Sequence, residues 1–221
     1  LAFESIEHCL DQVPETRTKV MVNIGSPDEA FSQHRLPVAG IGLGRIEFII
    51  TEHIRIHPRA LIDFDTYPAI KRKDFARRKL NAEIERLTPG YKDKRAFYVD
   101  ELAEGVAKIA AVVYPKPAII RFSDFKTNEY RTLIGGDQYE PVEENPMIGW
   151  RGASRYYHDD FRAAFALECA ALKKARTGMG LTNIIPMIPF CRTPEEGQQV
   201  LDLMAGFGLD RATDSSLKIY M

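Results

Sequence analysis

Three arginines lie near the predicted ends of three different apolar segments, and their chemistry suits the binding of an anion. They are Arg45, Arg121 and Arg151. A guanidinium group matches a carboxylate or a phosphate with paired hydrogen bonds. Three such cations repel one another when they converge, unless something anionic lies among them. If the three segments are neighbouring strands, we therefore expect a small dianion or trianion that bears both a carboxylate and a phosphate.

Three further polar residues are predicted to support these arginines. Glu47 and Asp124 are placed to orient the guanidinium groups when the site is empty, and Asn23 stands at the end of another apolar segment. The alternative interpretation treats each arginine as a lone strand-end residue that pairs with a surface carboxylate. That alternative is favoured for any one arginine taken alone, whereas the equivalent placement of all three favours a shared binding site.

Six short apolar segments are predicted to be the strands that position these side chains. Strands that alternate with helices indicate parallel βαβ units. Polar residues gather at the carboxyl ends of the segments, where (β/α)8 barrels place their chemistry. We therefore predict an α/β fold, an incomplete TIM-type (β/α)8 barrel with about six of its eight strands; an open doubly wound sheet is the alternative. The predicted strands are Val20–Ile24, Ile41–Phe48, Pro117–Phe122, Met147–Arg151, Asn183–Phe190 and Leu217–Met221.

The helices between these strands carry start, stop and packing signals. Ser26 and Thr193 each precede a proline and have a glutamate three residues later, which predicts helix N-termini. Residues 160–177 carry an apolar stripe and stop before Gly178, which suits a helix C-terminus. Residues 68–114 are predicted to form a charged helical insertion after the second strand. The members of the apolar stripe are Phe161, Phe165, Cys169 and Leu172.

The composition argues against several classes of function. The chain has 221 residues and a formal net charge of −1, so no global charge recruits nucleic acid or an anionic membrane. No apolar run approaches the roughly 20 residues that span a bilayer, and the three cysteines lack the spacing of a zinc site. We expect reduced thiols and a cytoplasmic protein. A basic cluster in the insertion is interpreted as a solvated helix face, and its members are Lys71, Arg72, Lys73, Arg77, Arg78 and Lys79.

The histidines show no metal-binding motif. His53 and His57 are four residues apart and could share a helix face, but Pro58 follows directly and predicts a helix end there. Both are therefore interpreted as surface histidines.

Several motifs, in order along nearly the whole chain, closely resemble those of one enzyme family. They are GIGLGRIEFII at 40–50, HPRAL at 57–61, IIRFSDFKTNEY at 119–130, EENPMIGWRGASRY at 143–156 and GLTNIIPMIPF at 180–190. The family is that of the phosphoenolpyruvate synthases (pyruvate, water dikinases), and the resemblance is to their carboxyl-terminal barrel, which binds phosphoenolpyruvate and pyruvate. Pyruvate phosphate dikinase and enzyme I of the sugar phosphotransferase system belong to the same wider group. Residues 1–221 are thus expected to be part of one such barrel domain.

The resemblance implies a reaction and gives the arginines roles. The family converts ATP, pyruvate and water to AMP, phosphoenolpyruvate and phosphate, using magnesium and a phosphohistidine on a mobile domain of the same polypeptide. Arg45 and Arg121 match its substrate-binding arginines, and Arg151 matches a further arginine near the phosphoryl group. Such cations neutralise the substrate carboxylate and the transferring phosphoryl group.

The resemblance also implies that other functional residues of the family lie outside this chain. Magnesium ligands are expected beyond Met221, with a protonating cysteine on the eighth strand, and the ATP-binding and phosphohistidine domains are expected upstream. No catalytic residue and no metal ligand is therefore assigned within 1–221, and we expect the isolated chain to make no phosphoenolpyruvate. Open sheet edges predict self-association into a homo-oligomer.

Two alternatives to this interpretation stay open. The first is the enzyme I barrel, which acts in the phosphorylation of a partner protein; the helical insertion and the SDFKTNEY stretch at 123–130 argue against it. The second is a non-catalytic binding or assembly module, which the missing magnesium and cysteine positions favour.

Overall fold

The computed structural model describes residues 3–4, 6, 9–65 and 75–221. At its centre is a parallel sheet of four strands in the order β1-β2-β3-β4, so each strand lies next to the one that precedes it along the chain. The predicted α/β class with a parallel sheet is confirmed. The strands are β1 (Val22–Ile24), β2 (Ile41–Arg45), β3 (Ala118–Arg121) and β4 (Ile184–Met187).

Helices connect the strands, as expected for βα units. The α-helices are α1 (Pro27–Ser32), α2 (Ile46–Ile49), α3 (Pro58–Ile62), α4 (Phe75–Leu87), α5 (Lys94–Val113), α6 (Thr127–Thr132), α7 (Ala153–Tyr156), α8 (Asp159–Lys173) and α9 (Pro194–Gly206). Shorter 3-10 and π segments are η1 (Leu10–Gln12), η2 (Ile50–Ile54), η3 (Gly136–Gln138) and η4 (Lys174–Gly178). Of the helices in the described residues, none is long and apolar enough to cross a membrane.

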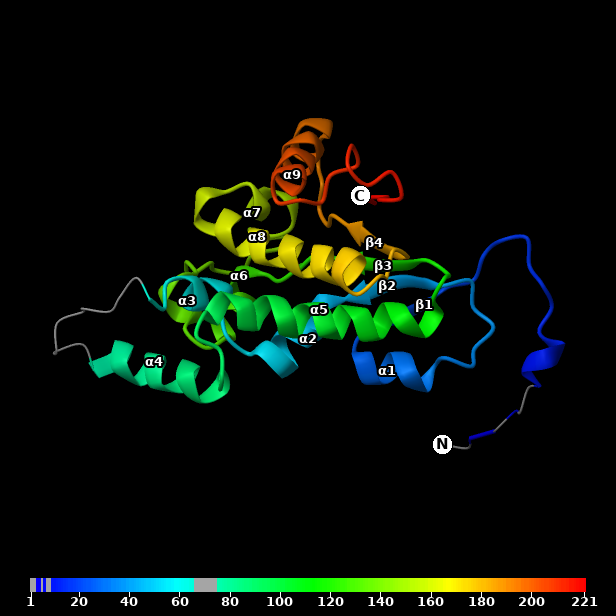
Figure 1. Cartoon of the computed structure of the whole chain (residues 1–221), viewed down its shortest axis with the longest axis horizontal. Helices are drawn as coiled ribbons and strands as arrows, with labels where there is room; N and C mark the ends of the chain where they lie inside the picture. The colour runs from blue at the N-terminus through cyan, green and yellow to red at the C-terminus, as the bar shows by residue number, and fades with distance from the viewer. Residues whose placement is uncertain (1–2, 5, 7–8, 66–74) are drawn as a thin grey trace.

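Helices α5 and α8 lie side by side along the sheet (Figure 1). The helical character predicted for 68–114 is confirmed for α4 and α5, and α5 packs on the core. It contacts β2, β3, α1 and α3, and it buries residues such as Leu102, Val106 and Ile109. Charged residues such as Glu104 and Lys108 lie on its exposed face. α5 is therefore a wall of the core as well as part of the crossover between β2 and β3.

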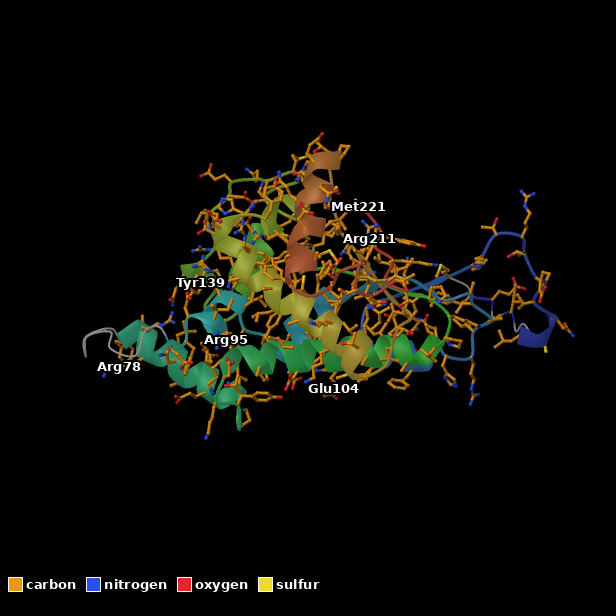
Figure 2. All side chains as sticks on the ribbon, turned by 45° about the horizontal axis from the view of Figure 1, so that its top comes forward. Arg78, Arg95, Glu104, Tyr139, Arg211 and Met221 are labelled. Carbon is orange, nitrogen blue, oxygen red and sulfur yellow. The ribbon has the colours of Figure 1, made fainter. Side chains whose placement is uncertain are left out.

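Helix α4 carries part of the predicted basic cluster. Arg78 and Lys79 are exposed, as a solvated face requires, and Figure 2 shows Arg78 at one end of the molecule. Arg77 differs, because it is 6% exposed and donates a hydrogen bond to Gln138 Oε1 at 3.0 Å. Outside the described residues lie Lys71, Arg72 and Lys73.

The prediction of a strand at Met147–Arg151 is wrong. This segment is a loop that leads into α7, and β3 pairs directly with β4 instead. Gly149 and Gly152 have φ angles of 75° and 65°. Residues in this left-handed conformation break the extended path that a strand requires.

The predicted strand Leu217–Met221 is reduced to a single bridge. Tyr220 pairs in parallel with Met187, which is also paired with β3 on its other side. The Tyr220 N–H donates to the carbonyl of Pro186 at 2.9 Å, and its own carbonyl accepts from the N–H of Ile188 at 2.8 Å. The segment therefore continues the sequential order of the sheet beyond β4.

The predicted helix signals are confirmed. The Ser26 hydroxyl accepts the N–H of Glu29 at 3.3 Å, and the Thr193 hydroxyl accepts that of Glu196 at 3.2 Å, so each residue is an N-cap. Helix α8 continues into η4, which ends at Gly178. The stripe on α8 faces the core, and its four residues are all buried.

Candidate anion-binding site

A cavity of about 270 Å³ opens at the carboxyl ends of β2 and β3. Arg45 and Arg121 are the last residues of these two strands and are paired in the register of the sheet. Arg151 reaches the same cavity from the loop before α7. The structure therefore brings the three predicted arginines together where parallel sheets usually bind ligands. The cavity is lined by Arg45, Glu47, Phe48, Thr51, Arg121, Asp124, Phe125, Glu129 and Arg151.

Asp124 links two of the arginines. Its Oδ2 lies 3.0 Å from Arg121 Nη1, and its Oδ1 accepts a hydrogen bond from Arg151 Nε at 2.8 Å. Its backbone carbonyl accepts a second hydrogen bond from Arg151, from Nη2 at 2.8 Å. The side chain of Asp124 is only 2% exposed. One buried carboxylate therefore fixes the separation and orientation of two guanidinium groups.

Glu47 holds Arg121 from the other side. Strand β2 stops at Arg45, so Glu47 lies in the first turn of α2 and not in a strand as predicted. Its Oε1 accepts hydrogen bonds from Arg121 Nη2 at 2.8 Å and from the backbone N–H of Asp124 at 2.7 Å. Burial raises the pKa of Glu47, and the charge of Arg121 opposes that rise. Its Oε2 is buried and has no hydrogen-bond partner among the described residues.

Arg45 is the cation of the cavity that lacks a carboxylate partner among the described residues, whereas Arg121 and Arg151 are both paired. Its guanidinium carbon lies 5.4 Å from the centroid of the Phe48 ring. Its Nε is buried, and within the described chain it donates no hydrogen bond. A buried donor without an acceptor costs free energy, so an anion that accepts from Arg45 would remove this cost.

The loop that carries Arg151 is held in place by hydrogen bonds from Arg155 and by close packing at Gly152. Arg155 donates from Nε and Nη2 to the carbonyl of Trp150, at 3.1 and 3.0 Å. Gly152 has a φ of 65°, and a Cβ there would collide with the backbone carbonyl that precedes Phe190. The Arg151 guanidinium lies 4.6 Å from the centroid of the Phe190 ring. A strand is therefore not needed to position this arginine.

The sequence analysis missed a buried polar cluster beneath this loop. Its interpretation of His57 as a surface residue is wrong: His57 is 0% exposed, caps the start of α3, and has Nε2 at 2.9 Å from Glu140 Oε1. Glu140 also accepts from both terminal nitrogens of Arg155, at 2.7 and 2.9 Å. Burial lowers the pKa of His57. Although burial acts to raise it, hydrogen bonds from His57 and Arg155 hold the pKa of Glu140 below its usual value.

The polar lining of the cavity differs from the prediction at two residues. Asn23 is exposed in the middle of β1 and does not line the cavity. Glu129, which was not predicted, does line it, and its Oε2 accepts the backbone N–H of Lys126 at 2.7 Å in the first turn of α6. The acids that contact the arginines are therefore Glu47 and Asp124.

The described residues do not by themselves fit a magnesium site. Within them no group of three or more His, Cys, Asp or Glu side chains is arranged to hold a metal ion. Of the four carboxylate oxygens of Glu47 and Asp124, three contact arginines or a backbone N–H, and Glu47 Oε2 alone lacks a partner among the described residues. We therefore derive no chemical step through a metal from this part of the chain.

Comparison with known proteins identifies the kind of domain that holds this cavity. Residues 5–215 match the family described as "PEP-utilising enzyme, PEP-binding domain". The chain is 52% identical, over its whole length, to a phosphoenolpyruvate synthase of Synechocystis sp., and 54% identical over 96% of its length to one of Deinococcus radiodurans. The Escherichia coli phosphoenolpyruvate synthase is 47% identical over the whole chain. The chain spans about a quarter of the length of these relatives, 26%, 26% and 27% respectively. By this match and by its arginine-lined cavity, the chain belongs to the PEP-utilising enzymes and corresponds to their PEP-binding domain.

Proposed function

We propose that this chain supplies the phosphoenolpyruvate and pyruvate site of a phosphoenolpyruvate synthase. The whole protein would convert ATP, pyruvate and water to AMP, phosphoenolpyruvate and phosphate. The observation that carries the proposal is the cavity in which Arg45, Arg121 and Arg151 meet. The relatives named above support the synthase over the enzyme I alternative.

The charges of the cavity suit phosphoenolpyruvate, which carries a carboxylate and a phosphate on the same carbon atom. Glu47 and Asp124 pair with Arg121 and Arg151, and Glu129 is a third acid of the lining. None of these acids pairs with Arg45, whose donors, within the described residues, stay free for a ligand. A ligand with two anionic groups can contact Arg45 with one group and a second arginine with the other. A monoanion can satisfy only one of these contacts, so the cavity favours the larger charge.

The same groups would assist the transfer of the phosphoryl group. In the reaction that the resemblance implies, a P–N bond to a histidine breaks and a P–O bond to the enolate oxygen of pyruvate forms. The histidine would come from another domain of the whole protein. Negative charge collects on the phosphoryl oxygens and on the enolate, and guanidinium groups that are already oriented stabilise it without reorganising. Orientation is the contribution of Asp124 and Glu47.

We propose further that the sheet is part of a (β/α)8 barrel. The sequential parallel order of β1 to β4 and the bridge of Tyr220 beside β4 support this, as does the cavity at the carboxyl ends of the strands. A cytoplasmic location, self-association, and the use of ATP and magnesium belong to the proposal for the whole protein.

The test is titration calorimetry of the chain with phosphoenolpyruvate. We expect binding, and we expect Arg45→Ala to weaken it by about 10–100-fold, the effect of removing charged hydrogen bonds. Arg78→Ala is the matched control, since it removes an exposed arginine of α4, and its affinity should equal that of the unmodified chain. Equal affinity of the Arg45→Ala variant would reject the assignment of the cavity. Absence of binding together with concentration-dependent association would favour an assembly module.

A further inference from the structure

Ser123 is held on every polar atom by buried side chains. Its N–H donates to Glu168 Oε2 at 3.1 Å, and its hydroxyl donates to Glu168 Oε1 at 2.5 Å. The same hydroxyl lies 2.5 Å from the hydroxyl of Tyr130, and the carbonyl of Ser123 accepts from the Tyr156 hydroxyl at 2.6 Å. The partners come from α6, α7 and α8. The hydrogen-bonding groups of Ser123, in the short segment after β3, are therefore all satisfied by side chains of three helices.

Glu168 is the unusual member of this group. It lies within α8, is 0% exposed, and forms no ion pair with a cation in the described part of the chain. Its hydrogen-bond partners are the N–H and hydroxyl of Ser123 and the hydroxyl of Tyr130. Burial of an acid is costly unless it is hydrogen-bonded, and the proposed reaction makes no direct use of this residue. Its contacts therefore point to a role exerted through Ser123.

Because Ser123 directly precedes Asp124 in the chain, Glu168 can act on Asp124 through it. Ser123 lies directly before Asp124, whose N–H donates to Glu47 and whose carboxylate holds Arg121 and Arg151. Two successive backbone N–H groups thus donate to two buried glutamates, Glu168 and Glu47. Asp124 makes its contacts at 2.7–3.0 Å. A displacement of about 1 Å would take them beyond hydrogen-bond length.

We propose that Glu168 is a positioning residue for the substrate cavity: by accepting the N–H and the hydroxyl of Ser123, it fixes the segment on which Asp124 holds Arg121 and Arg151. The inference deepens the proposed function and rests on it for the identity of the ligand. Glu168 itself does not line the cavity. Its effect is to keep two guanidinium groups in place before a ligand arrives.

The proton state of Glu168 sharpens the test. Burial raises the pKa of Glu168 to about 7, against the hydrogen bonds from Ser123. The groups that face it are Glu47, which adds to the rise, and the hydroxyls of Tyr98, Tyr130 and Tyr156. A protonated Glu168 can still accept the Ser123 N–H on one oxygen while its hydroxyl donates to Ser123 Oγ. Glutamine offers the same donor and acceptor arrangement, so Glu168→Gln should imitate the neutral acid.

The experiment compares Glu168→Leu, Glu168→Gln and Cys169→Ala in the full chain. Leucine fills the space but leaves the N–H of Ser123 without an acceptor and its hydroxyl with only that of Tyr130, so phosphoenolpyruvate affinity should fall at least tenfold. Glutamine retains an acceptor for the N–H, so the loss should be less than threefold. Cys169→Ala is the structural control, since Cys169 is buried beside Glu168 on α8; it should lower the melting temperature without changing affinity. Amide exchange at Ser123 and Asp124 should accelerate in the leucine variant alone.

The possible results separate this inference from the proposed function. Unchanged affinity and unchanged exchange in Glu168→Leu would overturn the positioning role. Equal losses of affinity in the leucine and glutamine variants, each matched by a loss of melting temperature, would also overturn it in favour of a purely structural role. If the unmodified chain binds no phosphoenolpyruvate, the proposed function fails, and amide exchange alone then decides whether Glu168 holds the segment.

Discussion

The cavity and the buried cluster of His57, Glu140 and Arg155 use the same chemistry in opposite ways. In the cluster, Arg155 is 0% exposed, and Glu140 accepts two hydrogen bonds from it. In the cavity, three guanidinium groups share two carboxylates, and Arg45 has neither. A complete set of partners belongs to an architectural element, because nothing remains to bind a ligand. An incomplete set, held in place by partners that are themselves fixed, belongs to a binding site.

The two regions also differ in how pH acts on them. In the cluster the pKa of His57 and that of Glu140 both lie below their usual values, so the cluster loses stability as pH falls. Next to the cavity the pKa of Glu168 is raised to about 7. For Glu168 the folded chain holds more protons than the unfolded chain between about pH 4.5 and 7, so its contribution to stability falls as pH rises through that window.

The largest effect should come from removing the shared acid of the cluster. Glu140→Ala leaves His57 and Arg155 without their carboxylate in the interior, and we expect the free energy of unfolding to fall by about 3–5 kcal/mol. Urea denaturation followed by circular dichroism measures this. A second change, Arg155→Met, should restore part of the loss by removing the unpaired charge. A loss below about 1 kcal/mol would show that the cluster is not a buried pair in solution.

Within the cavity, paired and unpaired arginines should behave differently. Arg121→Ala removes the cation that contacts Glu47 and Asp124, so the free energy of unfolding should fall by about 1–3 kcal/mol. Arg45→Ala removes no ion pair among the described residues and should leave it within about 0.5 kcal/mol. Both changes should weaken binding of phosphoenolpyruvate. Equal stabilities of the two variants in denaturant would contradict the distinction drawn between them.

The pH dependence of stability isolates Glu168 from the other acids. The unmodified chain should lose stability relative to Glu168→Gln as pH rises from about 4.5 to 7, by up to about 3 kcal/mol, because the variant has no proton to release. Melting curves of both chains across pH 4.5–8 give the difference, in which the contributions of other groups cancel. A flat difference would mean that Glu168 does not titrate in this window.

An exposed ion pair provides the smallest effect and the baseline for the comparison. Arg95 lies 2.9 Å from Asp93 at the start of α5, and both side chains are about half exposed, 56% and 49%. Figure 2 shows Arg95 among the side chains beside that helix. Arg95→Ala should change the free energy of unfolding by less than about 0.5 kcal/mol, since water screens such pairs. A change as large as that of Arg121→Ala would undermine the claim that burial separates these pairs.

The sequence alone predicted the parts of this structure that depend on local pattern. Arg45 and Arg121 follow short apolar segments, and their shared edge follows from parallel pairing. Residues 147–151 are mostly apolar, as a strand would be. The positive φ angles of Gly149 within the segment and of Gly152 just after it, which the sequence does not specify, break the extended path. Helix α5 was predicted as part of a charged helical insertion, and its packing on the core follows from the helical spacing of its apolar residues.

The remaining features depend on residues that are distant in the sequence. His57 and Glu140 are 83 positions apart, and Ser123 and Glu168 are 45 apart. No short motif joins either pair, and serine and glutamate are residue types usually found at the surface, while histidine is intermediate. Their burial is settled by the packing of helices on the sheet. A single sequence therefore locates the arginines of the cavity but not the groups that hold them.

The bridge that Asp124 forms between Arg121 and Arg151 affects how strongly small inorganic anions compete for the cavity. Three guanidinium groups without an internal acid would attract any abundant small anion, such as chloride or inorganic phosphate. The carboxylate of Asp124 lowers this attraction, because a small anion that contacts only one guanidinium group must displace a carboxylate that is already hydrogen-bonded to it. Only a molecule that reaches several donors at once gains from entering. Asp124 thus makes the cavity select ligands with several anionic groups over small inorganic anions.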